Sequence, residues 1–237
     1  MYFSCYDKTS EELHNINPKF AVLPIGAFEQ HGPHLPMGTD TIIAVALGNS
    51  LCEVLKNGLL LPPITISCSQ EHHGFFGNAF ISAETLIRTI DDISSSIRHS
   101  KINTLILINA HGGNYVLKNI AQELNLRESK ILIFPTNKHW KEALFHAGIE
   151  STIHDDMHAG EIETSILLSI YPELVRKDKL EDHLADDRSF LHVLGMKGYT
   201  TSGVIGLPSL ASAKKGKLLI EGLTNSACED LLSILNE

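Results

Sequence analysis

The stretch TLILINAHGGN, residues 104–114, decides how this chain is organised. Its first six residues are rich in β-branched side chains and are continuously apolar from Leu105 to Ile108, which is typical of a strand buried on both faces of a parallel sheet. His111 follows directly, and the Gly112-Gly113 pair is typical of a tight turn. The stretch therefore predicts a central strand that carries an imidazole at its carboxyl end.

Apolar runs on either side of this strand complete an alternating pattern. Strands are predicted over residues 20–26, 59–66 and 130–135, and helices over 41–55, 83–99, 114–126, 161–170 and 210–235, with one more helix after the fourth strand. This alternation implies βαβ units, hence an α/β fold with a mostly parallel sheet covered on both faces. No regular element is predicted over the polar, mixed stretch 177–199.

Length and composition bound the class of protein. The 237 residues are 43% hydrophobic and contain no linker-like stretch or repeat, so we expect a single domain over residues 1–237. A net charge of −9 disfavours nucleic acid or an anionic membrane as partner. No apolar run approaches the roughly 20 residues needed to span a bilayer. Residues 1–7 lack a secretory signal pattern, and a cytoplasmic location is expected.

Metal-binding side chains follow the first predicted strand. Glu29, His31 and Asp40 lie within twelve residues, and ligands in parallel sheets gather outside the carboxyl ends of the strands, where His111 also lies. A metal that activates water needs such oxygen and nitrogen ligands, and two metals need a bridging carboxylate. We expect Glu29, Asp40 and His111 on one metal and His31 with Asp40 on the other. Asp40 is the predicted bridge.

A third segment, DDMHAGEIETS at residues 155–165, adds candidate catalytic groups. His158 precedes the predicted helix and is placed to act as general acid for a leaving nitrogen, since an imidazole titrates near neutral pH. Glu161 and Glu163 point to different faces of that helix, so one of them is expected to reach the metals.

Each of these residues also has an ordinary structural explanation. The histidines at 31 and 111 could be turn residues, Asp40 could be a helix N-cap, and the two glutamates could be first-turn carboxylates favoured by the helix dipole. Such explanations account for the residues singly. They do not account for the gathering of these residues at strand ends.

Four motifs in order resemble the creatininase (creatinine amidohydrolase) superfamily. They are EQHGPHLP at residues 29–36 with Thr39-Asp40, NAHGGN at 109–114, HAGEIETS at 158–165, and GVIGLP at 203–208 followed by AKKG at 213–216. The resemblance implies a three-layer α/β/α sandwich and a homo-oligomer, commonly a hexamer built as a trimer of dimers. It also implies two divalent metal ions per chain, zinc first and manganese or iron as alternatives. By position, Glu29, His31, Asp40 and His111 match family metal ligands, and His158 matches the catalytic histidine.

The chain departs from creatinine-cleaving members at Gly113, where those members carry a glutamate that binds metal, and Trp140 is its only tryptophan. We expect Glu163 to replace the missing ligand, with Glu161 kept as a catalytic group and as the alternative ligand. The Gly-Gly form is similar to members that deformylate a pyrimidine intermediate and to the peptidase that trims the mycofactocin precursor.

The principal hypothesis is a metal-dependent amidohydrolase, a hydrolase of carbon–nitrogen bonds other than typical peptide bonds. Its substrate would be a cyclic amide, a formamide or a short peptide, attacked by metal-activated water. The alternative from another class is a catalytically degenerate binding subunit that keeps its metal for structure. A phosphate-binding enzyme is a weaker alternative, because the sequence holds no P-loop or GxGxxG motif.

Overall fold

A computed structural model describes residues 8–127 and 129–235 of the chain. Its sheet has four strands, β1 (Phe20–Ile25), β2 (Gly58–Leu60), β3 (Thr104–Asn109) and β4 (Lys130–Phe134), in the order β2-β1-β3-β4. Every pairing in this sheet is parallel. The carboxyl ends of β1 and β3 therefore lie next to each other at one edge of the sheet.

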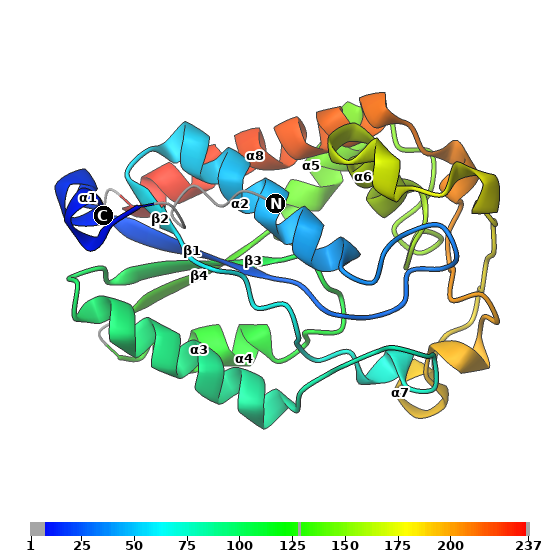
Figure 1. The fold of residues 1–237 in the computed structure, drawn as a ribbon, viewed down its shortest axis with the longest axis horizontal. Helices are drawn as coiled ribbons and strands as arrows, with labels where there is room; N and C mark the ends of the chain where they lie inside the picture. Colours follow the sequence, from blue (N-terminus) through cyan, green and yellow to red (C-terminus); the bar gives the residue numbers. More distant parts are fainter. Residues whose placement is uncertain (1–7, 128, 236–237) are drawn as a thin grey trace.

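Helices cover both faces of the sheet (Figure 1). One layer contains α2 (Thr39–Leu55), α5 (Asn137–Ala147), α6 (Glu161–Ile170) and α8 (Ala213–Leu235), and the other contains α3 (Ala83–Arg98) and α4 (Leu117–Leu124). The remaining helices are α1 (Ser10–Ile16), α7 (Leu191–Leu194) and the short 3-10 turns η1 (Gln70–His72), η2 (Pro172–Leu174), η3 (Lys177–Lys179), η4 (Met196–Gly198) and η5 (Pro208–Leu210).

The strand sequences explain these layers, because successive side chains of a strand point to opposite faces. In β3, Ile106 and Ile108 belong to the core under α2 and α8, whereas Leu105 and Leu107 belong to the core under α3 and α4. All four side chains are fully buried. The predicted α/β sandwich with a parallel sheet, covered on both faces, is thus confirmed.

Two predicted elements are clearly shorter in the structure than predicted. The strand predicted over 59–66 ends at Leu60, because the Pro62-Pro63 pair that follows cannot donate to a ladder; only Ile64 returns to bridge Ile25. The helix predicted from residue 114 begins at Leu117, since residues 112–116 form turns. Ser82 caps α3 as expected, its side chain accepting from the Thr85 N–H.

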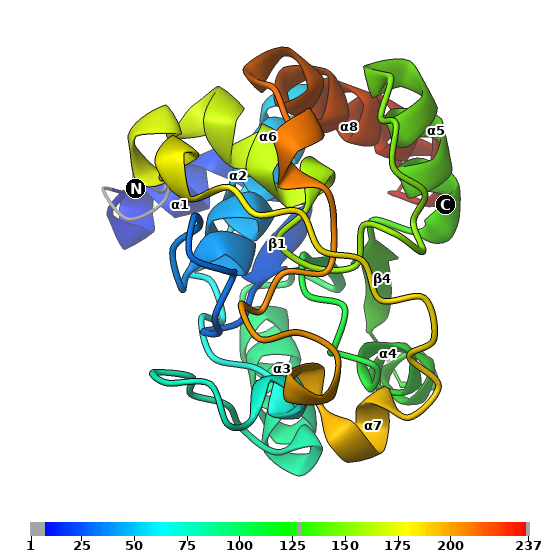
Figure 2. The same ribbon diagram turned by 90° about the vertical axis from the view of Figure 1, so that its right-hand side faces the viewer.

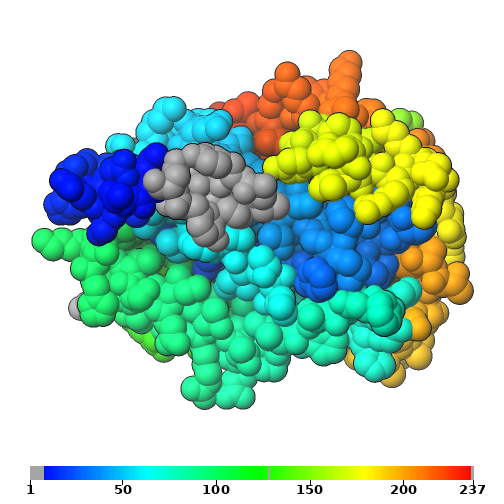
Figure 3. Space-filling view, viewed as in Figure 1, coloured from blue at the N-terminus to red at the C-terminus, as the bar shows by residue number. Residues whose placement is uncertain are grey.

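Loops collect at the carboxyl edge of the sheet, as the view onto that end shows (Figure 2). The segment 175–200, with its short turns and α7, crosses this end of the molecule. In the space-filling view α1 lies at the opposite end (Figure 3). Within the described ranges, no helix has both the length and the apolar character required to cross a bilayer.

Candidate metal centre

Of the seven side chains predicted for the site, six meet at the carboxyl edge and one, Glu161, does not. Glu29 and His31 lie in the loop after β1, Asp40 in the first turn of α2, His111 after β3, and His158 and Glu163 on either side of the start of α6. Glu29, His31, Asp40, His111 and His158 are buried. Since each comes from a loop or helix start, the sheet itself brings the distant segments together.

The distances between donor atoms show how closely these groups converge. Asp40 Oδ1 lies 3.1 Å from His31 Nε2, and Asp40 Oδ2 lies 3.2 Å from His111 Nδ1. Glu29 Oε1 lies 3.2 Å from the same nitrogen of His111. Asp40 is thus placed between the two histidines, one oxygen facing each, as the predicted bridge requires.

Several buried oxygens in this cluster lack hydrogen-bond partners. Both carboxylate oxygens of Glu29 and Oδ2 of Asp40 accept no hydrogen bond from any described residue, although ring nitrogens lie near them. An unpaired buried carboxylate is costly. Separations of 3.1–3.2 Å are close to the roughly 3.3 Å edge of a tetrahedron of ligands around an ion with bonds of about 2.0–2.1 Å. The residues therefore fit a divalent metal ion.

Three histidines are held by backbone carbonyls on the side away from the cluster. His31 Nδ1 donates to the Glu29 carbonyl at 3.1 Å, His111 Nε2 to the Cys68 carbonyl at 2.9 Å, and His158 Nε2 to the Gln30 carbonyl at 2.6 Å. A carbonyl oxygen only accepts, so each of these nitrogens carries the hydrogen. The other nitrogen of each neutral ring then presents a lone pair to the cluster, as a metal ligand must.

His72, which lies in η1, is a member of the cluster that sequence reasoning did not assign. Gln30 Oε1 accepts from the Gly32 N–H, so Gln30 Nε2 donates both to the Gly203 carbonyl and to His72 Nδ1 at 3.1 Å. Neutral His72 therefore carries its hydrogen on Nε2, 3.1 Å from Glu29 Oε1. It offers the cluster an N–H group and not a lone pair. The sequence feature that could have indicated His72 was its position after the second predicted strand.

The two glutamates of α6 have separate environments. Glu163 Oε1 lies 3.9 Å from His31 Nε2, and its Oε2 accepts from the Ala159 N–H at 2.6 Å. Glu161 points away, where it accepts from Lys215 and from the Glu150 and Ser151 N–H groups. The structure thus brings Glu163 to the cluster. It does not bring Glu161 there, because that buried carboxylate is held by Lys215 of α8.

In the metal-free cluster, the pKa of each group depends on the charges of its neighbours. Burial disfavours a charge on His31, but the Asp40 and Glu163 carboxylates outweigh it and raise its pKa to about 10. Burial alone would raise the pKa of Asp40, yet His31 and His111 hold it well below its usual range. For Glu29, burial dominates and raises the pKa to about 7. Without a cation, the site therefore keeps protons on His31 and His111, whereas burial and the neighbouring charged rings lower the pKa of His72 and of His158.

A cavity of about 590 Å³ opens beside the cluster. His111, His158 and Glu163 face it, and its apolar wall includes Trp140 and Ile153. This volume is in the range of small-molecule sites. A polar reacting group can thus lie against the cluster while an apolar part of a ligand packs on the wall.

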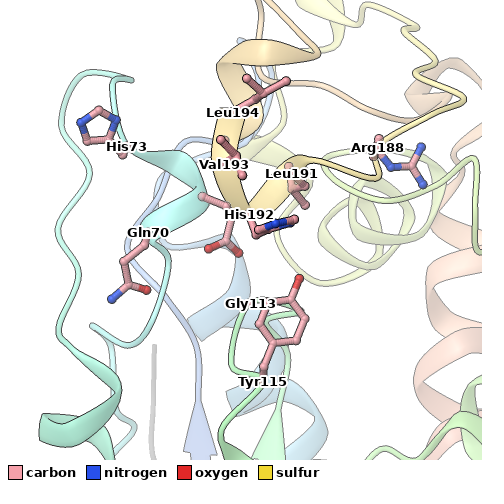
Figure 4. A pocket seen from close by; sticks show the side chains of 11 residues that line it. Gln70, His73, Gly113, Tyr115, Arg188, Leu191, His192, Val193 and Leu194 are labelled. Atoms are coloured by element: carbon pink, nitrogen blue, oxygen red, sulfur yellow. The ribbon is translucent and has the colours of Figure 1, made fainter.

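A second cavity of about 670 Å³ lies behind the turn that carries His111 (Figure 4). Tyr115 lines one side, and Gln70, Arg188 and the α7 residue His192 line others. Gly113 also lines it, as does Glu71, whose Oε1 lies 3.3 Å from His111 Nε2.

Comparison with known proteins agrees with this geometry. Residues 7–231 match the Creatininase family, described as creatinine amidohydrolase. The chain is 30% identical to the mycofactocin precursor peptide peptidase of Mycolicibacterium smegmatis, over 94% of this chain and 87% of that protein. It is 33% identical to the protein of the same name from Mycobacterium ulcerans, over 88% and 82%. Identity to the creatinine amidohydrolase of Pseudomonas putida is 27%, over 84% of each.

Solved structures share the fold. One described as "Creatininase Mn" superposes with a TM-score of 0.85 at 22% identity, over 98% of each chain. Together with the match over nearly the whole sequence, this agreement confirms the expected family and the three-layer fold. The chain belongs to the creatininase family and is an amidohydrolase, a hydrolase of carbon–nitrogen bonds other than typical peptide bonds.

Proposed function

We propose that this protein is a metal-dependent amidohydrolase with two divalent ions per chain, zinc first and manganese or iron as alternatives. Glu29, Asp40 and His111 would hold one ion, and His31, Asp40 and Glu163 the other. The observation that carries the proposal is the anchored ring of His111, whose free Nδ1 faces buried oxygens of Glu29 and Asp40 that have no hydrogen bond. Imidazole and carboxylate ligands suit all three metals.

The chemistry follows from these groups. Ions held by these residues would lower the pKa of a water molecule and would polarise a substrate carbonyl. His158 would hold and move the proton at Nδ1, since its Nε2 hydrogen is committed to the Gln30 carbonyl. It would receive a proton as water attacks and pass it to the departing nitrogen. Glu161, bound to Lys215, takes no part in these steps.

A short peptide with a susceptible terminal amide is the substrate class that we favour. Two relatives, at 30% and 33% identity, are mycofactocin precursor peptide peptidases, and the cavity beside the cluster has an apolar wall. A formamide is the second candidate, because a deformylase of Methanococcus maripaludis is 29% identical over 81% of this chain. Turnover of short peptides and of formamides, compared at equal metal loading, separates the two.

Metal content per chain tests the proposal. Protein purified without chelator is expected to bind about two ions, and Glu163→Gln about one, because only one ion uses that carboxylate. Glu161→Gln is the matched control, two residues away on the same helix but bound to Lys215, and should still bind two. Wild-type protein that binds no ion after reconstitution would refute the proposal.

The alternative of a degenerate binding subunit makes a different prediction. A subunit that keeps metal only for structure would lose its fold on chelation and show no hydrolysis when loaded. Under our proposal, chelated protein stays folded on its two apolar cores but loses hydrolysis, which returns on adding the metal. Far-UV circular dichroism and activity of the same sample distinguish these outcomes.

A further inference from the structure

Glu71 lies behind His111 and contacts the edge of its ring that faces away from the cluster. Its Oε1 is 3.3 Å from His111 Nε2, whereas His111 Nδ1 faces Glu29 and Asp40. One ring cannot bring both nitrogens to the same ion, so Glu71 does not share an ion with His111 Nδ1. It contacts the ligand and not the metal.

The space for this carboxylate exists because residue 113 is glycine. A Cβ built on Gly113 would lie well within 3.0 Å of both Glu71 Oε1 and His111 Nε2, closer than Cβ atoms approach other groups. The φ angle of Gly113 is not positive, so space and not backbone conformation requires glycine here. Any side chain at this position must displace Glu71, the His111 ring, or both.

The turn that carries Glu71 is held from both sides. The Gln70 side chain donates to the Ile81 carbonyl at 2.7 Å, and Asn78 donates to the His72 carbonyl at 2.6 Å. The Cys68 N–H donates to the Asn114 side chain at 3.1 Å, which ties this loop to the turn after His111. Glu71 is therefore presented to His111 by fixed backbone, with only 14% of its side chain exposed.

We propose that Glu71 is the positioning residue for His111. Together with the Cys68 carbonyl, it fixes the ring with Nε2–H outward and Nδ1 toward the ion, and Gly113 is glycine to make room for it. This inference rests on the proposed function, in which His111 binds metal. Carboxylates behind metal-binding histidines orient the ring and raise its basicity, and their loss commonly weakens metal binding about 10–100-fold.

Cobalt binding tests the proposal, with Co²⁺ as the probe and a chromophoric chelator as competitor. Glu71→Ala is expected to weaken Co²⁺ affinity about 10–100-fold and to alter the visible spectrum of the bound ion, while stoichiometry at saturation stays as in wild type. Glu71→Gln keeps a hydrogen-bond acceptor without the charge, and its Co²⁺ affinity should lie between those of wild type and Glu71→Ala. His73→Ala, an exposed neighbour that lines the same cavity, is the matched control and should match wild type.

A second measurement separates positioning from a general effect on the loop and from failure of the proposed function. In metal-free protein, long-range ¹H–¹⁵N spectra should show His111 protonated at Nε2, and in Glu71→Ala that proton should exchange faster with water. Thermal unfolding of the metal-free variant should match wild type. Wild-type Co²⁺ affinity and spectrum in Glu71→Ala would overturn the inference. If wild type itself binds no Co²⁺, the proposed function fails, and an unchanged His111 proton in Glu71→Ala would then overturn the inference independently.

Discussion

His158 has only one nitrogen with which to act on a substrate. Because Nε2 donates to the Gln30 carbonyl, Nδ1 is the atom that must carry the proton in transit. His158→Gln should lower kcat/KM by about 10²–10⁴-fold while metal content stays unchanged. His146→Gln, on the exposed side of α5, is a suitable control. Full activity in His158→Gln would contradict the assigned role.

Protons and metal ions compete for the same imidazoles. The pKa of His31 is raised to about 10, so its ring is protonated at neutral pH in the metal-free protein, and an ion must displace that proton. Metal affinity should therefore rise with pH, about tenfold per pH unit for each displaced proton, up to pH about 10. Zinc titrations in weak buffer with a pH indicator should register this proton release. Affinity that is independent of pH from 6 to 9 would contradict the expectation.

Some residues of the site could be predicted from the sequence, and others could not. Glu29, His31, Asp40 and His111 were predictable because each directly follows a strand or opens a helix whose pattern is strong. Glu161 and Glu163 could not be told apart, since both lie in the first helical turn, and only the position of Lys215, more than fifty residues later, decides between them. Glu71 lies in a 3-10 turn without periodicity, so its partner could not be inferred.

The start of α6 is stabilised by Glu161. Its side chain is fully buried and accepts from Lys215 and from two backbone N–H groups. Glu161→Gln should lower the free energy of unfolding by about 1–3 kcal/mol, since the buried carboxylate loses its charge and Lys215 keeps only the exposed Glu150 carboxylate. Urea denaturation measures this. Glu221→Gln, which removes an exposed carboxylate of α8 near Lys217, should change stability by less than about 0.5 kcal/mol.

The effect of Glu161→Gln should also depend on pH. Burial opposes ionisation of Glu161, but Lys215 and the backbone N–H groups outweigh it and lower the pKa below its ordinary 4.5. A carboxylate with a lowered pKa stabilises the fold above its unfolded pKa, and this stabilisation is lost as the pH falls through the folded pKa. The difference between wild type and variant should thus be constant near pH 7 and shrink below about 4.5. A difference that grows in acid would be inconsistent with this ion pair.

The contact between the end of β1 and the start of α2 sets the distance between Glu29 and Asp40. Gly26 packs directly on Thr41, where an added Cβ would overlap the Thr41 backbone nitrogen and hydroxyl. Gly26→Ala should cost about 1–3 kcal/mol and also weaken metal binding, since the two ligand segments are forced apart. Gly38→Ala, with no atom near its added Cβ, should leave stability and metal binding nearly unchanged. Calorimetry measures the stability of the two variants, and metal titration measures their metal affinity.

Among the elements, the four strands were predictable because each is a short apolar run between turn signals. Their order was not, since β1 pairs with β3 across about eighty intervening residues. No regular element was predicted over residues 177–199, where the structure has two 3-10 turns, η3 and η4, and the four-residue α7. The path of this segment across the carboxyl edge depends on tertiary contacts that no local pattern encodes.

The oligomeric state of the protein can be tested directly. The family resemblance predicts a homo-hexamer. Phe76 lies within the 70–80 loop and is fully exposed, and a large exposed apolar side chain of this kind is often covered at a protein–protein interface. Sedimentation velocity should give the mass of six chains, and Phe76→Ser should shift the distribution toward smaller species. A wild-type monomer with full activity would refute the hexamer.

The proposed ligands are spread along the chain from Glu29 to Glu163, and every one is needed before both ions are held. During synthesis, the ribosome releases the residues in order, so the first ligands emerge well before the α6 carboxylate exists. The proposed centre therefore cannot be completed before Glu163 has been made, about two thirds of the way along the chain. Binding of the second ion would then follow synthesis of α6, and the supply of free metal at that stage would select which ion is bound.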